Sequence, residues 1–193
     1  MNDIPKKLNL GCGFFPKDGF LNLDKDKDYP ADIFHDLECF PWPLPNDYFE
    51  YIIMDHVLEH LTDLESTIKE IEKLLKKGGT LQIKVPHFSR GFTHWNHKIG
   101  FDVTFPIYFD PSTSGSFKNT QLKPVSTKLR WFSQPDLKKR HLSKISYFLG
   151  STLGFVFDFI GNINLFLHQG YYRIGLEVMK KLNLFLKNKL NKA

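Results

Sequence analysis

The sequence is poor in cysteine and shows no sign of export. Only two cysteines, Cys12 and Cys39, occur in 193 residues, which argues against a disulfide-rich scaffold and a cysteine-based zinc site. A reducing compartment is the default environment for such a chain. The first seven residues are polar and lack the apolar core of a signal peptide. We therefore expect a cytoplasmic protein.

A clean membrane-spanning segment is also missing. The nearest candidate, residues 145–167, is long enough, but Asp158 lies near its middle and Asn162 and Asn164 follow. Each of these side chains is costly in hydrocarbon, and three glycines weaken the segment as a single helix. We expect it to form either a lid over an acceptor site or an interfacial helix that rests on a membrane.

Acidic residues are scarce in the C-terminal part of the chain. Residues 115–193 contain 14 Lys/Arg and 3 Asp/Glu, whereas residues 1–114 contain 12 and 18. Such a basic segment favours an anionic partner, which could be a nucleic acid, a phosphate-bearing substrate or a membrane surface. Lysines that only keep a phenylalanine-rich segment soluble explain the charge equally well.

Short apolar segments alternate with turns along the first ninety residues. They predict strands at 7–10, 20–23, 32–35, 51–54 and 80–85. A helix is predicted between the last two: Thr62 and Glu65 form a capping box at its start, Lys76 and Lys77 occupy its last turn, and the glycines at 78–79 end it. Strands joined through a helix indicate a mostly parallel sheet. Further strands are predicted at 128–132 and 172–178, and residues 111–127 are predicted to form a loop.

Polar residues stand where the predicted strands end. Gly11-Cys12-Gly13 closes the first strand, Asp24 the second, Asp36 the third and Asp55-His56 the fourth. Ligands of an open parallel sheet bind at the carboxyl ends of its strands. A glycine turn lets backbone N–H groups approach an anion, and acids there accept from ribose hydroxyls or an adenine amine. The pattern predicts a nucleoside pocket.

The dinucleotide fingerprint G-x-G-x-x-G is broken, because Pro16 stands where its third glycine belongs. This favours a mononucleoside cofactor over a dinucleotide.

Five segments together carry a family resemblance: LNLGCG at 8–13, GFLNLD at 19–24, FHDL at 34–37, FEYIIMDHVLEHL at 49–61 and LLKKGGTL at 74–81. In order and spacing they resemble the class I S-adenosylmethionine-dependent methyltransferases, especially small ones encoded among surface-polysaccharide genes. The resemblance is clear over residues 7–86. It implies an α/β fold with a Rossmann-like, mostly parallel sheet of about seven strands and flanking helices, and S-adenosylmethionine as cofactor.

The resemblance also assigns cofactor contacts. It implies that Gly11 and Gly13, with Asn9 and Cys12 beside them, border the methionine part. Asp24 would hold the ribose, Asp36 with Leu37 the adenine, and Asp55 with His56 would lie near the sulfonium. Two features depart from the family. Asn9 stands where an acid is common, and only ten residues separate Gly13 from Asp24, fewer than a parallel crossover normally needs. We therefore expect a shortened or missing first helix.

Three histidines are candidate catalytic residues: His56, His87 and His97. A hydroxyl acceptor needs a general base, because its pKa is far above neutrality. The last two follow the strand at 80–85, a region that faces the active site in this fold. The alternative for each of them is a histidine that merely caps a loop.

A metal site is the competing interpretation. His56, Glu59 and His60 match the H-x-x-E-H motif of a metal-dependent hydrolase, yet the helix predicted to start at Thr62 leaves the two histidines off one continuous helix. The group His87, His94 and His97 matches no standard metal spacing. We expect no metal.

The sequence thus predicts one domain over residues 1–193, with a cofactor-binding half at 7–86 and an acceptor-binding, sheet-completing half at 87–193. The predicted reaction is methyl transfer to an acceptor for which analogy suggests a saccharide or a lipid-linked sugar, with peripheral contact to an anionic membrane at its inner face. A catalytically decayed binding subunit is the alternative. A nucleic-acid acceptor is disfavoured, because the resemblance implies a D/N-P-P-Y-like tetrapeptide after the strand at 51–54 in amino-methylating enzymes, and none follows it here.

Overall fold

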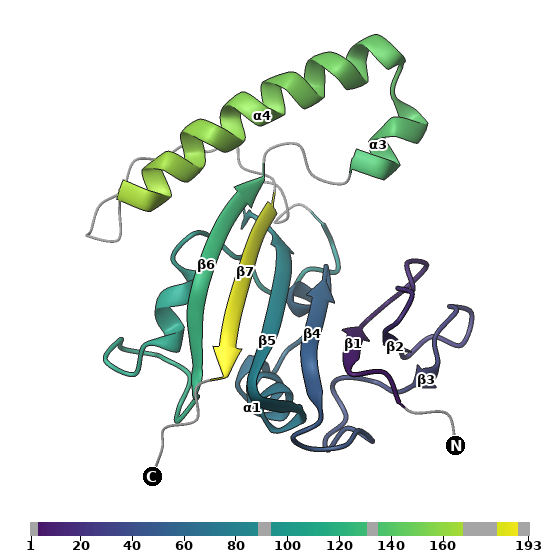
Figure 1. Cartoon of the computed structure of the whole chain (residues 1–193), viewed down its shortest axis with the longest axis vertical. Coiled ribbons are helices and arrows are strands. Elements are labelled where there is room, and N and C mark those ends of the chain that lie inside the picture. The colour runs from purple at the N-terminus through teal and green to yellow at the C-terminus, as the bar shows by residue number, and fades with distance from the viewer. Residues whose placement is uncertain (1–3, 89–93, 131–134, 168–180, 189–193) are drawn as a thin grey trace.

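Short apolar segments that stop at glycine, aspartate or proline become the strands of one sheet. A computed structural model of the chain describes residues 4–88, 94–130, 135–167 and 181–188. Its sheet has seven strands in the order β3-β2-β1-β4-β5-β7-β6 (Figure 1). The strands are β1 (Lys7–Leu10), β2 (Leu21–Asp24), β3 (Ile33–Phe34), β4 (Phe49–Asp55), β5 (Leu75–Pro86), β6 (Leu122–Arg130) and β7 (Lys181–Asn188).

Only β7 runs against its neighbours, because β1 to β5 pair in parallel and β7 is antiparallel to both β5 and β6. The middle of each central strand is buried, as the fully buried side chains of Leu8, Leu10 and Ile52 show, and consecutive buried residues are typical of parallel strands. The predicted Rossmann-like fold class is confirmed.

The first crossover contains no helix, as the short Gly13–Asp24 spacing predicted. A polar network around Asn22 takes its place. The Asn22 carboxamide oxygen accepts from Asn9 Nδ2 at 3.0 Å and from the Lys17 amide at 2.8 Å, and its nitrogen donates to the Lys17 and Phe20 carbonyls. One buried side chain thus supplies hydrogen bonds that a helix would have made internally.

The helix between β4 and β5 is α1 (Leu64–Leu74), and both of its predicted ends are wrong. Asp63, not Thr62, is the N-cap, and its carboxylate accepts from the Ser66 amide at 2.9 Å. Thr62 instead donates its hydroxyl to Glu38. At the other end, β5 begins at Leu75, so Lys76 and Lys77 lie in the strand and not in the last helical turn.

The C-terminal strands also differ from expectation. β6 begins at Leu122, inside the predicted loop, and its Pro124 is tolerated because β6 is an edge strand. The strand predicted at 172–178 lies outside the described residues, while β7 occupies Lys181–Asn188. Short 3-10 turns, η1 (Leu58–His60) and η2 (Phe105–Phe109), complete the body of the domain.

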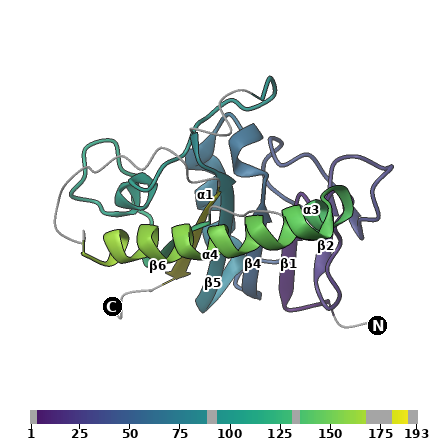
Figure 2. The same ribbon diagram turned by 90° about the horizontal axis from the view of Figure 1, so that it is seen from above.

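Two helices lie above the carboxyl ends of the parallel strands: α3 (Pro135–His141) and α4 (Lys144–Leu167) (Figures 1 and 2). α4 is one continuous helix, although its three glycines were expected to weaken it as a single helix. Gly154 and Gly161 are buried, and the Asn162 side chain bonds both the amide and the carbonyl of Leu129 in β6 at 3.0 Å. Small and polar residues therefore form the side of α4 that packs on the sheet. Among the described residues, no helix is long and apolar enough to cross a membrane.

Candidate functional site

The parallel register brings the predicted site residues to one edge of the sheet. Leu10 pairs with Leu23 on one side and with Met54 on the other, and Asp24 pairs with Phe34. The residues that follow these strands therefore emerge side by side, beneath the α3–α4 pair in Figure 2.

The glycine turn after β1 is fixed by backbone geometry. Gly11 and Gly13 both have positive φ, of 65° and 52°, a region that favours glycine. A Cβ at Gly11 would also lie 2.4 Å from Val57 Cγ2, so the turn can approach the segment after β4 only as glycine. The amides of Gly11 and Cys12 both donate to the Leu23 carbonyl, which locks the turn onto β2.

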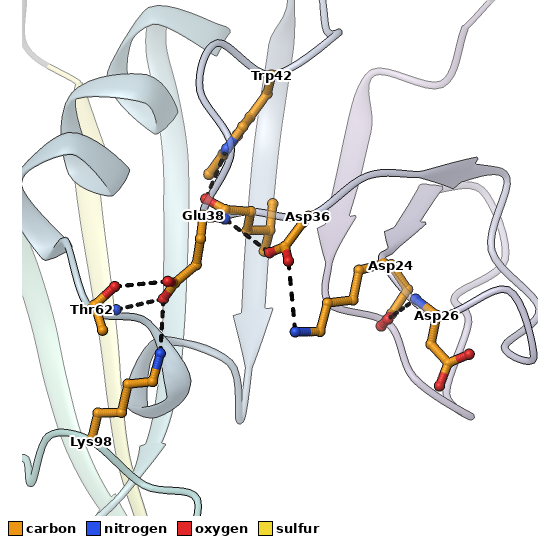
Figure 3. Close-up of polar contacts among 9 residues, drawn as sticks. Asp24, Asp26, Asp36, Glu38, Trp42, Thr62 and Lys98 are labelled. Carbon is orange, nitrogen blue, oxygen red and sulfur yellow. Dashed lines mark hydrogen bonds and ion pairs between the residues drawn. The ribbon is translucent and has the colours of Figure 1, made fainter.

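Asp24 is the acid most tightly built into this turn. Its carboxylate accepts from the Gly13 amide at 2.8 Å and from the Asp26 amide at 3.1 Å (Figure 3), and the residue is buried. The neighbouring Cys12 thiol is buried too, and burial, with a smaller contribution from Asp24, raises its pKa. The amides of the turn thus donate to acceptors within the protein. The Asp24 carboxylate is therefore the group of this turn that can accept hydrogen bonds from a ligand.

Asp36 and Leu37 follow β3 at the carboxyl edge of the sheet. Asp36 is partly exposed, lies 3.8 Å from Lys25 Nζ and accepts from the Glu38 amide. Leu37 is buried and accepts at its carbonyl from Trp42 Nε1. Glu38, which the sequence did not single out, accepts from Thr62 and from Lys98 (Figure 3), and the Thr62 hydrogen bonds followed by Lys98 lower its pKa.

Asp55 and His56 end β4 in different surroundings. The Asp55 carboxylate pairs with Lys84 Nζ of β5 at 3.1 Å. His56 has a positive φ of 61°, a conformation uncommon for residues other than glycine and often found at functional sites. Its Nδ1 lies 3.1 Å from Glu59 Oε1. Because a carboxylate only accepts, Nδ1–H donates, and in the neutral ring the lone pair is on Nε2.

His97 lies next to His60 of η1 and His94 of its own loop. Its ring lies 4.8 Å from the His60 ring and 4.5 Å from the His94 ring, centroid to centroid.

His56 precedes η1 and Leu61 is already extended, so the two histidines of the H-x-x-E-H motif do not share a helix, as predicted.

His87 lies in a different environment. It is buried, packs on the Phe88 ring at 4.7 Å and forms an isolated bridge with Phe101. Burial lowers its pKa, against a smaller opposite effect of Asp102. A buried, aromatic-packed ring fits the loop-capping alternative better than a base that meets an acceptor.

An aromatic hollow lies beyond the His97 loop. It measures about 390 Å³, and its lining includes Leu64 of α1 with Ile99, Phe101, Phe105 and Phe117. The sequence did not indicate it, because these aromatic residues show no periodicity along the chain.

The sheet order and the row of acids at its carboxyl edge define the Rossmann-like methyltransferase class. A family model for the methyltransferase domain matches residues 14–141, so the chain belongs to the methyltransferase-domain family and is a methyltransferase. No curated protein sequence matches the chain.

Solved structures share the fold at low identity. An S-adenosylmethionine-dependent methyltransferase from Mesorhizobium loti superposes with a TM-score of 0.56 at 12% identity, over 94% of this chain and 89% of that one. Coclaurine N-methyltransferase bound to N-methylheliamine and SAH gives 0.55 at 13% identity, over 94% and 66%. The [4+2]-cyclase SpnF gives 0.55 at 14% identity, over 96% and 75%. At these identities the likeness shows the fold alone.

The lowered pKa of His87 predicts a loss of stability in acid. The ordinary imidazole pKa is 6.5, so as pH falls below it the unfolded chain binds a proton that the folded protein resists. The free energy of unfolding then decreases until the folded pKa is reached, by about 1.4 kcal/mol per unit of pKa difference. Urea unfolding of His87→Gln between pH 7.5 and 5 should show a shallower decline than the wild type. The exposed His141→Gln should retain the wild-type slope, and equal slopes in all three proteins would contradict the assignment.

Proposed function

We propose that the protein transfers a methyl group from S-adenosylmethionine to a hydroxyl of a lipid-linked saccharide at an anionic membrane surface. The observation that carries the methyl-donor assignment is the row of carboxylates at the ends of β2, β3 and β4, next to a glycine turn that cannot bear a side chain. Residues 7–86 would bind the cofactor and residues 87–193 the acceptor.

The residues at this edge suit a cationic nucleoside. Asp24 would accept from the ribose hydroxyls, and Asp36 with Leu37 would border the adenine. Gly11 and Gly13, with Asn9 and Cys12, would border the methionine part, and Asp55 with His56 would lie nearest the sulfonium. When bound, S-adenosylmethionine supplies an electrophilic methyl group, and the fold's contribution is to orient it toward the acceptor.

Calorimetric titration of Asp24→Asn tests the cofactor pocket. The asparagine oxygen can still accept from the Gly13 amide, but its NH₂ cannot accept from ribose hydroxyls. We expect micromolar binding of S-adenosylmethionine and S-adenosylhomocysteine to the wild type and a loss of about 10–100-fold in the variant, on the order of 1.4–2.8 kcal/mol.

Asp26→Asn is the matched control, because Asp26 is exposed and two residues away. It should bind as the wild type does. A folded wild-type protein that gives no heat with either ligand would refute the proposal and favour a catalytically inactive binding subunit.

The pair His56–Glu59 supports a hydroxyl acceptor. Glu59 is fully buried and fixes Nδ1–H, so Nε2 is the nitrogen able to take a proton, and it has no hydrogen-bond partner among the described residues. A base oriented by a buried carboxylate is what an alcohol needs to become a nucleophile. Nε2 is covered in this structure, so the ring or its cover must move when the acceptor binds.

His56→Gln should lower the transfer of tritiated methyl from S-adenosylmethionine to a glycolipid fraction by about 100-fold or more. Because His56 would also border the sulfonium, calorimetric affinity for the cofactor should fall by no more than about tenfold, far less than the loss of transfer, which separates loss of the base from loss of the pocket. His35→Gln is the control at the same edge. Unaltered transfer in His56→Gln, or label that enters protein or nucleic acid, would overturn the hydroxyl assignment.

The exposed face of α4 supports a membrane-borne acceptor. Most of the residues exposed between Lys144 and Ile163 are large and apolar: Ile145, Phe148, Leu149, Leu153, Phe155, Val156, Phe159, Ile160 and Ile163. Lys139, Arg140 and Lys144 are exposed at the start of this face. Apolar side chains that enter the headgroup region, with cations beside them, suit an anionic bilayer.

Flotation with phosphatidylcholine vesicles that contain phosphatidylglycerol tests this surface. The wild type should float at low salt, and less without the anionic lipid or at high salt. Because two phenylalanines leave the bilayer, Phe148→Asp combined with Phe155→Asp should weaken flotation at least tenfold.

Ile107→Asp, an exposed apolar position on η2, should float as the wild type does. No flotation of the wild type at low salt would refute the membrane proposal. In that case, dimerisation by light scattering that the double variant abolishes would assign the face to a second copy instead.

A further inference from the structure

Three side chains with metal-binding atoms converge just beyond the end of β4. Glu59 and His60 belong to η1, and His97 comes from the loop that follows β5. Each offers one nitrogen or carboxylate oxygen, and these three atoms lie within 4.8 Å of one another. Two histidines and one carboxylate are a common ligand set for divalent transition metals.

Glu59 is buried with one oxygen unused. Its side chain is 0% exposed; Oε1 contacts His56 Nδ1, and Oε2 is buried without a hydrogen-bond partner. An unsatisfied buried carboxylate oxygen is costly, and a bound cation would satisfy it.

His60 is held in the tautomer that a metal requires. Its Nδ1 lies 3.0 Å from the Asn96 carbonyl oxygen, which can only accept, so Nδ1 carries the proton. The lone pair of the neutral ring is then on Nε2. Metal-binding histidines characteristically use their second nitrogen in this way, with a backbone carbonyl as partner.

Two contacts of Lys98 hold the loop that carries His97 next to η1. The Lys98 amide donates to the Glu59 carbonyl at 2.8 Å, and Lys98 Nζ pairs with Glu38 at 3.2 Å (Figure 3). The His94 ring stacks on that of His97, with 23° between their planes. The positive charge of Lys98 is therefore balanced by Glu38, and the histidines are positioned before any ion arrives.

We propose that Glu59, His60 and His97 bind a divalent transition-metal ion of the zinc class. Tetrahedral zinc with bonds of about 2.0–2.1 Å places its ligands roughly 3.3 Å apart, so the three atoms must approach by at most about 1.5 Å. The partly exposed histidines can do this by rotation. Three protein ligands leave a coordination position open. Glu59 Oε2 would then bind the ion, while Oε1 keeps its contact with His56 Nδ1.

Metal uptake by the full chain, without a polyhistidine tag, tests the site independently of any methyl transfer. Apo-protein should take up one Zn²⁺ in calorimetry, and Co²⁺ should develop visible ligand-field absorption with a one-to-one end point. Because loss of an outer partner already costs 10–100-fold in metal affinity, His60→Ala and His97→Ala should each weaken binding by at least tenfold. Zn²⁺ should raise Tm in the wild type and not in these variants.

The exposed His141→Ala is the matched control and should bind as the wild type does. His56→Gln should retain the metal, which separates this site from the base. Glu59→Gln, should it fold, is expected to weaken binding as well; the two exposed-side histidine variants decide the question if it does not. Failure of the wild type to bind either ion, or equal affinity in His60→Ala, His97→Ala and His141→Ala, would overturn the proposal.

Discussion

The close approach of the Gly11 turn to Val57 is the constraint on which the site depends. β1 and β4 are neighbours at the centre of the sheet, so the segments that follow them must pack closely together at its carboxyl edge. Gly11 meets this requirement by having no side chain, and its positive φ turns the chain toward β2. Asp24 and His56 then lie on either side of the Gly11 turn, because β2 and β4 flank β1 in the sheet, and η1 begins two residues after His56.

Much of the N-terminal half is predictable because each strand there is a short apolar run with an obvious stop. β1 is followed by Gly11, β2 ends at Asp24 and β5 ends at Pro86, and the sheet edge that these strands form is where ligand-binding residues belong. The missing first helix was also foreseeable, since ten residues cannot hold a normal crossover. What replaces it, the hydrogen bonds of Asn22, was not, because an asparagine in a strand has no distinctive sequence pattern.

The remaining errors come from contacts between distant parts of the chain. Thr62 and Asp63 are both good N-caps, and Glu38, far away in sequence, removes Thr62 from the competition. His87 and His97 look alike in sequence, yet one is buried against Phe88 and the other meets His60. β6 and β7 carry lysines and a proline, and their pairing at the sheet edge is visible only once the parallel strands are in place.

The missing first helix has an electrostatic consequence. In nucleotide-binding α/β proteins, the N-terminus of that helix directs a partial positive charge and free amides at a phosphate. Here the corresponding amides donate to the Leu23 carbonyl and, at Gly13, to the Asp24 carboxylate. With these amides already hydrogen-bonded and no helix N-terminus behind them, the turn lacks the anion-binding groups that hold a pyrophosphate in dinucleotide-binding proteins.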